Sequence, residues 1–263
     1  MWAGCLASLL IGLTLGLIGG GGSILTVPVL VYLLQVDAVT ATAYSLFIVG
    51  ATSLAGVFPK YRNRELDTKA ALLFGLPSMA TVFLTRKYLL PAIPDTIGNL
   101  GGRLLSKGEL LLLLFALLMI VAAFTMITDK KARPAAEAVD HSWVLLFLGA
   151  AEGCISGLVG AGGGFLIIPA LVLLGKLPMK KAIGTSLLII AVKSLVGFTG
   201  DLGHFHIQWS LLLPVTALAV AGIFAGSALA SRIAAEKLKK GFGWFVIAMG
   251  LFILWKEGRF IFS

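Results

Sequence analysis

Residues 16–28 read Gly-Leu-Ile-Gly-Gly-Gly-Gly-Ser-Ile-Leu-Thr-Val-Pro, and this stretch interrupts an otherwise apolar run. A related break occurs 141 residues later, where residues 157–169 read Gly-Leu-Val-Gly-Ala-Gly-Gly-Gly-Phe-Leu-Ile-Ile-Pro. Each glycine in a helix interior costs roughly 1 kcal/mol relative to alanine. In lipid the freed backbone groups also need partners, so such a break is tolerated only inside protein or beside a watery cavity. A duplicated break of this kind therefore points to a transport site.

The composition is that of a polytopic membrane protein. Of the 263 residues, 59% are hydrophobic and 13% are charged, whereas soluble domains carry about 25% charged residues. Mean hydropathy is +1.01. Apolar runs recur from end to end, so a single signal peptide does not account for them. The start of the chain, Met1-Trp2-Ala3, also lacks the basic n-region of a cleavable signal.

The formal net charge of +9 also fits a membrane setting. The basic residues lie in short loops between apolar runs, where they contact anionic lipid headgroups and control topology. Nucleic acid is therefore not expected as a partner. Cys5 and Cys154 both fall within apolar segments, and we interpret them as small hydrophobes. His204, His206 and Asp201 form too loose a group for a metal site, so neither a metal nor a cofactor is expected.

The repeat extends well beyond the glycines. Residues 16–56 align with residues 157–197 without a gap and share 17 identities in 41 positions. The chain therefore divides into two related halves, residues 1–128 and residues 143–263. The charged, proline-containing stretch 129–142 is the predicted cytoplasmic linker between them.

Each half predicts five helical segments, of which the first two form a hairpin with the glycine break at its tip. The limb after each break has 14 residues, about 21 Å at 1.5 Å per residue, which is too short for a hydrocarbon core of about 30 Å. We therefore expect an all-α polytopic membrane protein with a hairpin and three transmembrane helices in each half. The segments are hairpin 2–35 with helices 39–58, 70–90 and 109–128, and hairpin 143–175 with helices 179–200, 209–230 and 242–260.

Lysine and arginine orient the two halves. With both termini outside, the inner loops hold 14 basic residues and the outer side holds six, which is the bias that the positive-inside rule expects. An odd number of crossings after each hairpin then inverts the second half, as in secondary transporters. We therefore predict inverted-topology repeats whose tips approach the middle of the bilayer from opposite sides. The six outer residues are Arg86, Lys87, Arg103, Lys107, Lys256 and Arg259.

The two tips are the predicted binding site. Each second limb begins with backbone N–H groups, near Gly21–Ile24 and near Gly162–Phe165, and helix N-termini attract anions. Glycine also lets a ligand come within hydrogen-bonding distance of the backbone. The first limbs end at the same tips with partly negative carbonyls, so a cation at those carbonyls remains an alternative.

Lys193 and Glu152 are the charges expected inside the membrane. A charge at this depth costs about 2.5–3.5 kcal/mol on insertion scales, so it faces a cavity or a partner. We keep two interpretations of Lys193 open, namely contact with a small oxyanion and pairing with Glu152. Glu152 is itself a candidate for proton coupling. The predicted substrate-binding residues are Gly21, Gly22, Ser23, Ser45, Gly162, Gly163, Gly164, Thr185, Ser186, Lys193 and Ser194.

An enzyme is not expected. The glycine runs lack the Gly-Lys-Ser/Thr ending of a phosphate-binding loop, and no predicted strand precedes them. There is also no Gly-x-Ser-x-Gly elbow and no pair of catalytic acids in the sequence. The alternatives to a transporter of anions are an anion channel and a cation permease that uses the hairpin carbonyls.

The motifs resemble those of the TauE/SafE sulfite exporter family. The paired Gly-x-x-Gly-x-Gly-Gly…Pro segments are followed by Ala43-Tyr44-Ser45-Leu46, by Gly184-Thr185-Ser186-Leu187 and by Lys193-Ser194-Leu195-Val196-Gly197-Phe198. The likeness covers both halves, although Asn is common in the family where this chain has Lys193. It implies a bacterial inner-membrane permease that exports sulfur-containing anions such as sulfite or organosulfonates. The expected partners are that small anion and the lipid bilayer, and the apolar surface is compatible with a homodimer.

Overall fold

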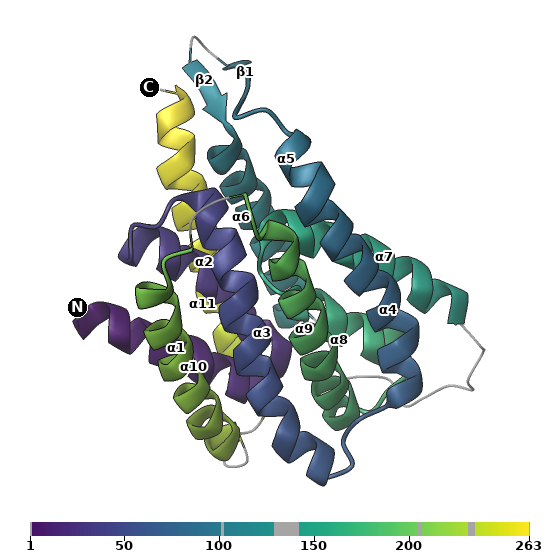
Figure 1. The fold of residues 1–263 in the computed structure, drawn as a ribbon. Coiled ribbons are helices and arrows are strands. Elements are labelled where there is room, and N and C mark those ends of the chain that lie inside the picture. The colour runs from purple at the N-terminus through teal and green to yellow at the C-terminus, as the bar shows by residue number, and fades with distance from the viewer. Residues whose placement is uncertain (1, 101–102, 129–141, 205–206, 231–234, 263) are drawn as a thin grey trace.

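The computed structural model describes residues 2–100, 103–128, 142–204, 207–230 and 235–262. The described residues form a bundle of helices with one small two-stranded sheet at its upper end (Figure 1). The predicted linker 129–142 lies outside the described residues, except for its last residue.

In the first half the helical geometry changes in two regions, residues 19–33 and residues 85–89. The chain stays helical through the first glycine run, which forms a 3-10 helix rather than an open break. An antiparallel strand pair with one irregularity in register follows the predicted segment 70–90, where the sequence predicted only a loop. The elements are α1 (Trp2–Ile18), η1 (Gly19–Leu25), α2 (Thr26–Pro28), η2 (Val29–Leu33), α3 (Ala38–Arg62), α4 (Thr68–Leu84), η3 (Thr85–Leu89), α5 (Leu90–Ala92), β1 (Thr96–Leu100), β2 (Arg103–Ser106) and α6 (Lys107–Thr128).

The second half is more regular. Its last helix begins at Ala235, seven residues before the predicted start at residue 242. The elements are α7 (Ser142–Val159), α8 (Gly164–Leu173), α9 (Met179–Asp201), α10 (Trp209–Ala230) and α11 (Ala235–Phe262).

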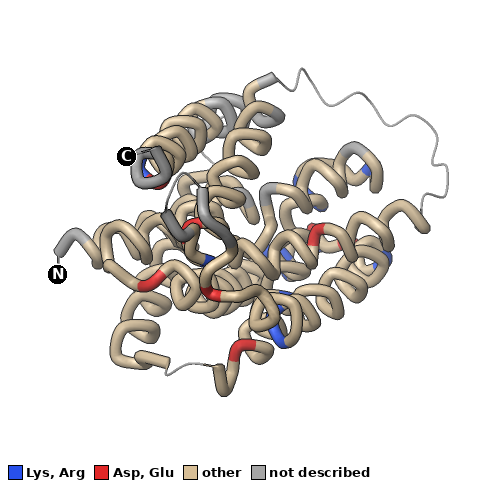
Figure 2. Tube along the Cα trace, turned by 90° about the horizontal axis from the view of Figure 1, so that it is seen from above, with Lys and Arg blue, Asp and Glu red and all other residues tan. Residues whose placement is uncertain are grey.

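The helices confirm an all-α, multi-pass membrane protein. Five described helices are long and apolar enough to cross a bilayer, and three shorter apolar helices accompany them. Large apolar side chains are exposed on the bundle, including Trp143 at 83% and Phe147 at 75%, as expected of a surface that faces lipid. Charged residues are sparse along the chain (Figure 2). The five spans are Ala38–Arg62, Thr68–Ala92, Lys107–Phe124, Met179–Asp201 and Trp209–Ala230.

Aspartates begin two of the long helices. The Asp37 carboxylate accepts hydrogen bonds from the backbone N–H groups of Val39 (3.0 Å) and Thr40 (3.2 Å) at the start of α3. The Asp67 carboxylate accepts one from Ala70 (2.9 Å) at the start of α4. Such N-caps are worth about 1 kcal/mol each, because they satisfy backbone donors that have no partner inside the helix. They fix where the two spans begin.

Contacts in one half recur in the other at the 141-residue offset. Helix α1 packs on α10, and α7, the equivalent of α1, packs on α4, the equivalent of α10. A Cβ added to Gly56 would lie 3.6 Å from Leu187, and one added to Gly197 would lie 3.3 Å from Leu46. Adding 141 to the number of one partner and subtracting 141 from that of the other converts each contact into its counterpart, so that Gly56 and Leu187 become Gly197 and Leu46.

Two side chain–backbone hydrogen bonds obey the same rule. The N–H of Gln208, just before α10, donates to the Tyr44 hydroxyl (2.6 Å). The N–H of Asp67, just before α4, donates to the Thr185 hydroxyl (2.9 Å). Residues 44 and 185, and residues 67 and 208, are each 141 apart. The two bonds fasten the start of α10 to α3 and the start of α4 to α9.

Helices α3 and α9 form the centre of the bundle and run antiparallel. Gly50 lies against Leu195, with the position of an added Cβ 2.9 Å from Leu195 Cγ. Further along α3, Gly56 lies against Leu187, which is earlier in α9. Residue numbers therefore rise along one helix as they fall along its partner. Figure 1 shows the two helices side by side in the middle of the bundle.

Candidate functional site

The two glycine runs meet in the interior of the bundle. A Cβ added to Gly20 would lie 2.6 Å from the Gly164 Cα, and one added to Gly164 would overlap the Gly20 backbone. Real Cβ atoms do not approach backbone this closely, so only glycine allows the contact. The sequence breaks at residues 19–25, called here the first tip, and at residues 160–164, the second tip, thus lie against each other.

The backbone N–H groups of the first tip bond largely within the tip itself. Its 3-10 helix uses i→i+3 hydrogen bonds, which differs from the free N–H groups expected near Gly21–Ile24. The Ser23 hydroxyl donates to the Gly20 carbonyl (2.8 Å). Gly22 lies against α1, where an added Cβ would be 2.7 Å from the Leu15 Cα. The predicted binding residues of this tip are therefore engaged locally.

The second tip is an open turn. Helix α8 begins at its last residue, Gly164, and the first intrahelical bonds run from the N–H groups of Leu166 (2.9 Å) and Ile167 (3.2 Å) to the Gly163 carbonyl. The N–H groups ahead of these have no partner within the helix, as at any helix N-terminus. Left-handed backbone at three glycines makes the turn: Gly160 (φ 72°), Gly162 (φ 67°) and Gly163 (φ 64°).

Lys193 is paired with Glu152 in the structure. The Lys193 Nζ donates to one carboxylate oxygen of Glu152, and the Ser78 hydroxyl donates to the other (2.7 Å). The three side chains come from α9, α7 and α4, and Lys193 and Glu152 are only 1% and 5% exposed. Of the two interpretations of Lys193, the ion pair is thus the one that the structure contains.

This ion pair lies directly against the second tip. A Cβ added to Gly163 would overlap the Glu152 carboxylate and would be 2.8 Å from the Lys193 Nζ. The absence of a side chain at Gly163 is what brings the pair against the tip backbone. A charge pair and a helix N-terminus therefore share one buried location.

Two buried hydroxyls lie beside the same tip. The Ser194 Oγ is 3.5 Å from the position of a Cβ on Gly162. Ser45 lies one turn after Thr42, which packs against Gly160, so Ser45 is on the α3 face that points to the second tip. Among the described residues, neither serine hydroxyl has a hydrogen-bond partner. Buried hydroxyls are nearly always paired, so these two are available to a ligand.

The structure does not bring Thr185 and Ser186 to the second tip. The Thr185 hydroxyl accepts the hydrogen bond from Asp67 at the far end of the bundle. The Ser186 hydroxyl donates to the Ile183 carbonyl of its own helix (2.8 Å). Ile183 packs on Gly19, so Ser186 lies on the α9 face toward the first tip.

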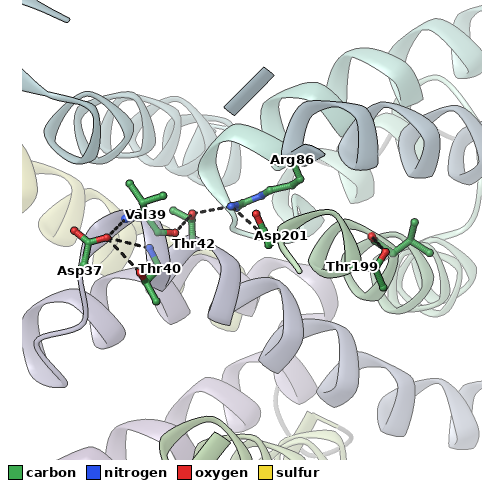
Figure 3. Close-up of polar contacts among 8 residues, drawn as sticks. Asp37, Val39, Thr40, Thr42, Arg86, Thr199 and Asp201 are labelled. Carbon is green, nitrogen blue, oxygen red and sulfur yellow. Dashed lines mark hydrogen bonds and ion pairs between the residues drawn. The ribbon is translucent and has the colours of Figure 1, made fainter. Parts of the chain in front are cut away.

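Sequence reasoning missed Arg86. The positive-inside count placed it on the outer side, but its side chain is 0% exposed within the span Thr68–Ala92. Its Nη1 donates to the Thr42 hydroxyl (3.0 Å) and lies 3.5 Å from a carboxylate oxygen of Asp201 (Figure 3). The signal was available, because Arg86 falls inside the predicted helix 70–90, and a charge inside a span marks function by default.

Broken helices that meet inside a polytopic bundle, next to buried charges, are typical of membrane transporters. The comparisons agree with this class. The chain belongs to the family described as Sulfite exporter TauE/SafE, whose profile matches residues 4–253.

The names of similar proteins also describe membrane transporters. A "Probable membrane transporter protein" of Xylella fastidiosa (strain 9a5c) is 32% identical over 94% of this chain and 92% of its own length. "Probable membrane transporter protein YdhB" of Bacillus subtilis (strain 168) is 28% identical over 84% of this chain and 87% of its own length. A protein of the same description from Methanocaldococcus jannaschii is 24% identical over 93% and 92%. No solved structure matches this chain significantly.

Proposed function

We propose that this protein exports small sulfur-containing anions, such as sulfite or organosulfonates, by alternating access around a site at the second tip. The observation that carries the proposal is the convergence of donors on Gly162 and Gly163. An ammonium group, the Ser194 hydroxyl and a helix N-terminus lie around this backbone. The Ser45 hydroxyl is on the α3 face toward the same tip, and within the part of the chain that the structure describes neither hydroxyl has a partner. A small oxyanion accepts hydrogen bonds from all three kinds of donor. The family description supports sulfite as the first substrate to try.

The two halves act, in this proposal, as inverted-topology repeats with residues 1–128 in one and 143–263 in the other. The contacts that recur at an offset of 141 residues support a pseudo-two-fold relation. The antiparallel course of the equivalent helices α3 and α9 supports an axis in the plane of the membrane. Such repeats transport by rocking from one arrangement to the one in which the two halves have exchanged conformations, around a fixed site.

Glu152 is proposed to link anion binding to a proton. In the structure the Glu152 carboxylate forms an ion pair with Lys193 and accepts a hydrogen bond from Ser78. A proton on Glu152 would leave the ammonium free to hold an anion at Gly163 instead. Anion and carboxylate thus compete for one cation, which couples the substrate to protonation of the same site.

The membrane potential favours export of such a substrate. Moving one charge across 100 mV is worth about 2.3 kcal/mol. A dianion leaving a cell that is negative inside therefore gains about 4.6 kcal/mol per 100 mV. A proton that leaves with it reduces the net charge and halves this gain, so the response to potential reports whether a proton accompanies the anion.

The proposed orientation places both termini outside the bacterial inner membrane and the linker 129–142 in the cytoplasm. The excess of Lys and Arg in the inner loops supports it. Exposed apolar side chains such as Trp244 and Trp255, 64% and 59% exposed, suit contact with lipid or with a second copy of the chain. We propose a homodimer as the assembly to test.

Flux from proteoliposomes tests the proposal. We expect saturable efflux of sulfite from the liposome lumen. The efflux should rise when the outside is made electrically positive, and it should be stimulated by sulfite added outside. Sulfate, thiosulfate and an organosulfonate are compared with and without a pH gradient, and protein-free liposomes are the control. Unsaturable flux without countertransport would favour an anion channel, and movement of a cation instead would favour the cation permease. If no anion moves, the proposal is wrong.

A further inference from the structure

Arg86 is a buried cation that the proposed site does not use. Its side chain is 0% exposed inside a span, at the outer end of the bundle where α3 begins and α9 ends. A guanidinium group is always charged, and removing it from water costs several kcal/mol unless hydrogen bonds and an opposite charge compensate.

The polar contacts of Arg86 with other described residues all use one nitrogen. The Arg86 Nη1 donates to Thr42 and faces Asp201, as Figure 3 shows. The Thr42 hydroxyl donates its hydrogen to the Val39 carbonyl (2.7 Å), so its oxygen accepts the hydrogen bond from Arg86. Among the described residues, the Arg86 Nε and Nη2 have no hydrogen-bond partner, although both atoms are buried.

These two free donors lie on the same edge of the guanidinium plane. The N–H groups of Nε and Nη2 point in parallel, and this edge binds two oxygens of one oxyanion side-on. Asp201 does not take that role, because it faces Nη1 at 3.5 Å, longer than the 2.7–2.9 Å of a charge-assisted hydrogen bond. The protein thus occupies one end of the guanidinium and leaves the two-oxygen edge unfilled.

The arginine is also connected to the second tip. Thr42, which holds Nη1, packs directly on Gly160. A Cβ added to Gly200 would lie 3.0 Å from the Arg86 Cβ, so Arg86 is held closely against α9. An anion bound to Arg86 would therefore lie near the second tip, against which Lys193 also lies.

The repeat shows that the scaffold itself does not require this arginine. At the 141-residue offset, the equivalents of Arg86, Thr42 and Asp201 are Ser227, Ile183 and Lys60. Lys60 instead pairs with Glu65 (2.9 Å), and both are partly exposed. The same helix crossing is therefore built once with a buried guanidinium and once without one.

We infer that Arg86 is a second anion-binding residue, whose Nε and Nη2 edge takes a sulfur oxyanion side-on near the second tip. The inference rests on the proposed function, because the ligand is the same transported anion. A sulfite or sulfonate group presents two oxygens to this edge, and in the outward path the anion passes from the Lys193 location to Arg86. Asp201 lowers the positive charge there and so lets the anion leave.

Binding of sulfite to the purified full-length protein, measured by calorimetry in detergent, tests this inference. Arg86→Lys keeps the charge beside Asp201 but lacks the two-donor edge, and we expect it to weaken sulfite binding at least about tenfold. Asp201→Asn removes the competing carboxylate and is expected to tighten sulfite binding by a similar factor. Lys87→Gln is the matched control, because Lys87 is the adjacent cation and its side chain is exposed. Its affinity is expected to equal that of the wild type.

The outcomes separate the two proposals. If the wild type binds sulfite and folded Arg86→Lys binds it equally well, the role of Arg86 is wrong while the proposed function stands. If Arg86→Lys does not fold, Asp201→Asn decides, and an unchanged affinity in that variant overturns the inference. If the wild type binds no sulfur oxyanion, the proposed function fails and this inference fails with it.

Discussion

Replacing Lys193 with Met while Glu152 is kept is expected to destabilise the protein by about 3–5 kcal/mol. The carboxylate is 5% exposed, so without Lys193 it is a buried charge whose remaining hydrogen bond comes from Ser78. Glu152→Gln alone leaves a buried ammonium group and is expected to cost a similar amount. Unfolding in detergent by heat or denaturant, compared with the wild type, measures both effects.

The double variant Lys193→Met/Glu152→Gln separates structure from function. Neutral partners carry no uncompensated charge, so most of the lost stability should return, and the coupling energy should be large and favourable. Transport of sulfite should nevertheless stay lost, because the site has no ammonium group for the anion. A stable double variant that transports sulfite like the wild type would show that the pair is purely structural. Equal destabilisation in the single and double variants would contradict the pairing itself.

Gly164→Ala is expected to destabilise the protein by about 1–3 kcal/mol and to abolish transport. The added Cβ would overlap the Gly20 backbone, and backbone cannot turn away as a side chain can. The two tips would be forced apart at the point where they meet. Gly163→Ala acts differently, since its Cβ meets the carboxylate of Glu152 and the ammonium group of Lys193. It is expected to displace that pair and to adopt a left-handed φ at a cost of about 1–2 kcal/mol.

Gly241→Ala is the matched control for both glycine variants. Gly241 is exposed on α11, and a Cβ there would meet nothing within 4 Å. It should leave sulfite flux unchanged and raise helix stability slightly. Flux per folded protein, with folding checked by size-exclusion chromatography, measures all three variants. Wild-type flux in Gly164→Ala would mean that the contact between the tips has no role in transport.

The long-range pattern of this fold could be predicted from the sequence because it rests on periodicity and repetition. Apolar length gives the membrane spans, and the glycine runs with their 141-residue offset give the two tips. The family and the multi-pass helical class are confirmed. The strand pair β1–β2 was not predicted, because five-residue and four-residue strands carry too short a pattern to be distinguished from a loop.

The site was harder to predict, because its contacts join residues far apart in the chain. Glu152 and Lys193 are 41 residues apart, and no spacing rule says that they meet. The first glycine run looks like the second in sequence but forms a 3-10 helix, since glycine permits many backbone conformations and packing selects one. Arg86 was assigned to the outer surface because counting charges by loop ignores how deep a residue lies in its helix.

The most direct test of the central claim is the location of a bound oxyanion. Selenite is a heavier relative of sulfite, and anomalous diffraction from crystals of the protein grown with it would locate the selenium atom. The account predicts a peak within hydrogen-bonding distance of the second tip, beside Gly163, Ser194 and Lys193. Selenite transport without a peak at this tip, or with a peak only at a place remote from both tips and Arg86, would contradict it.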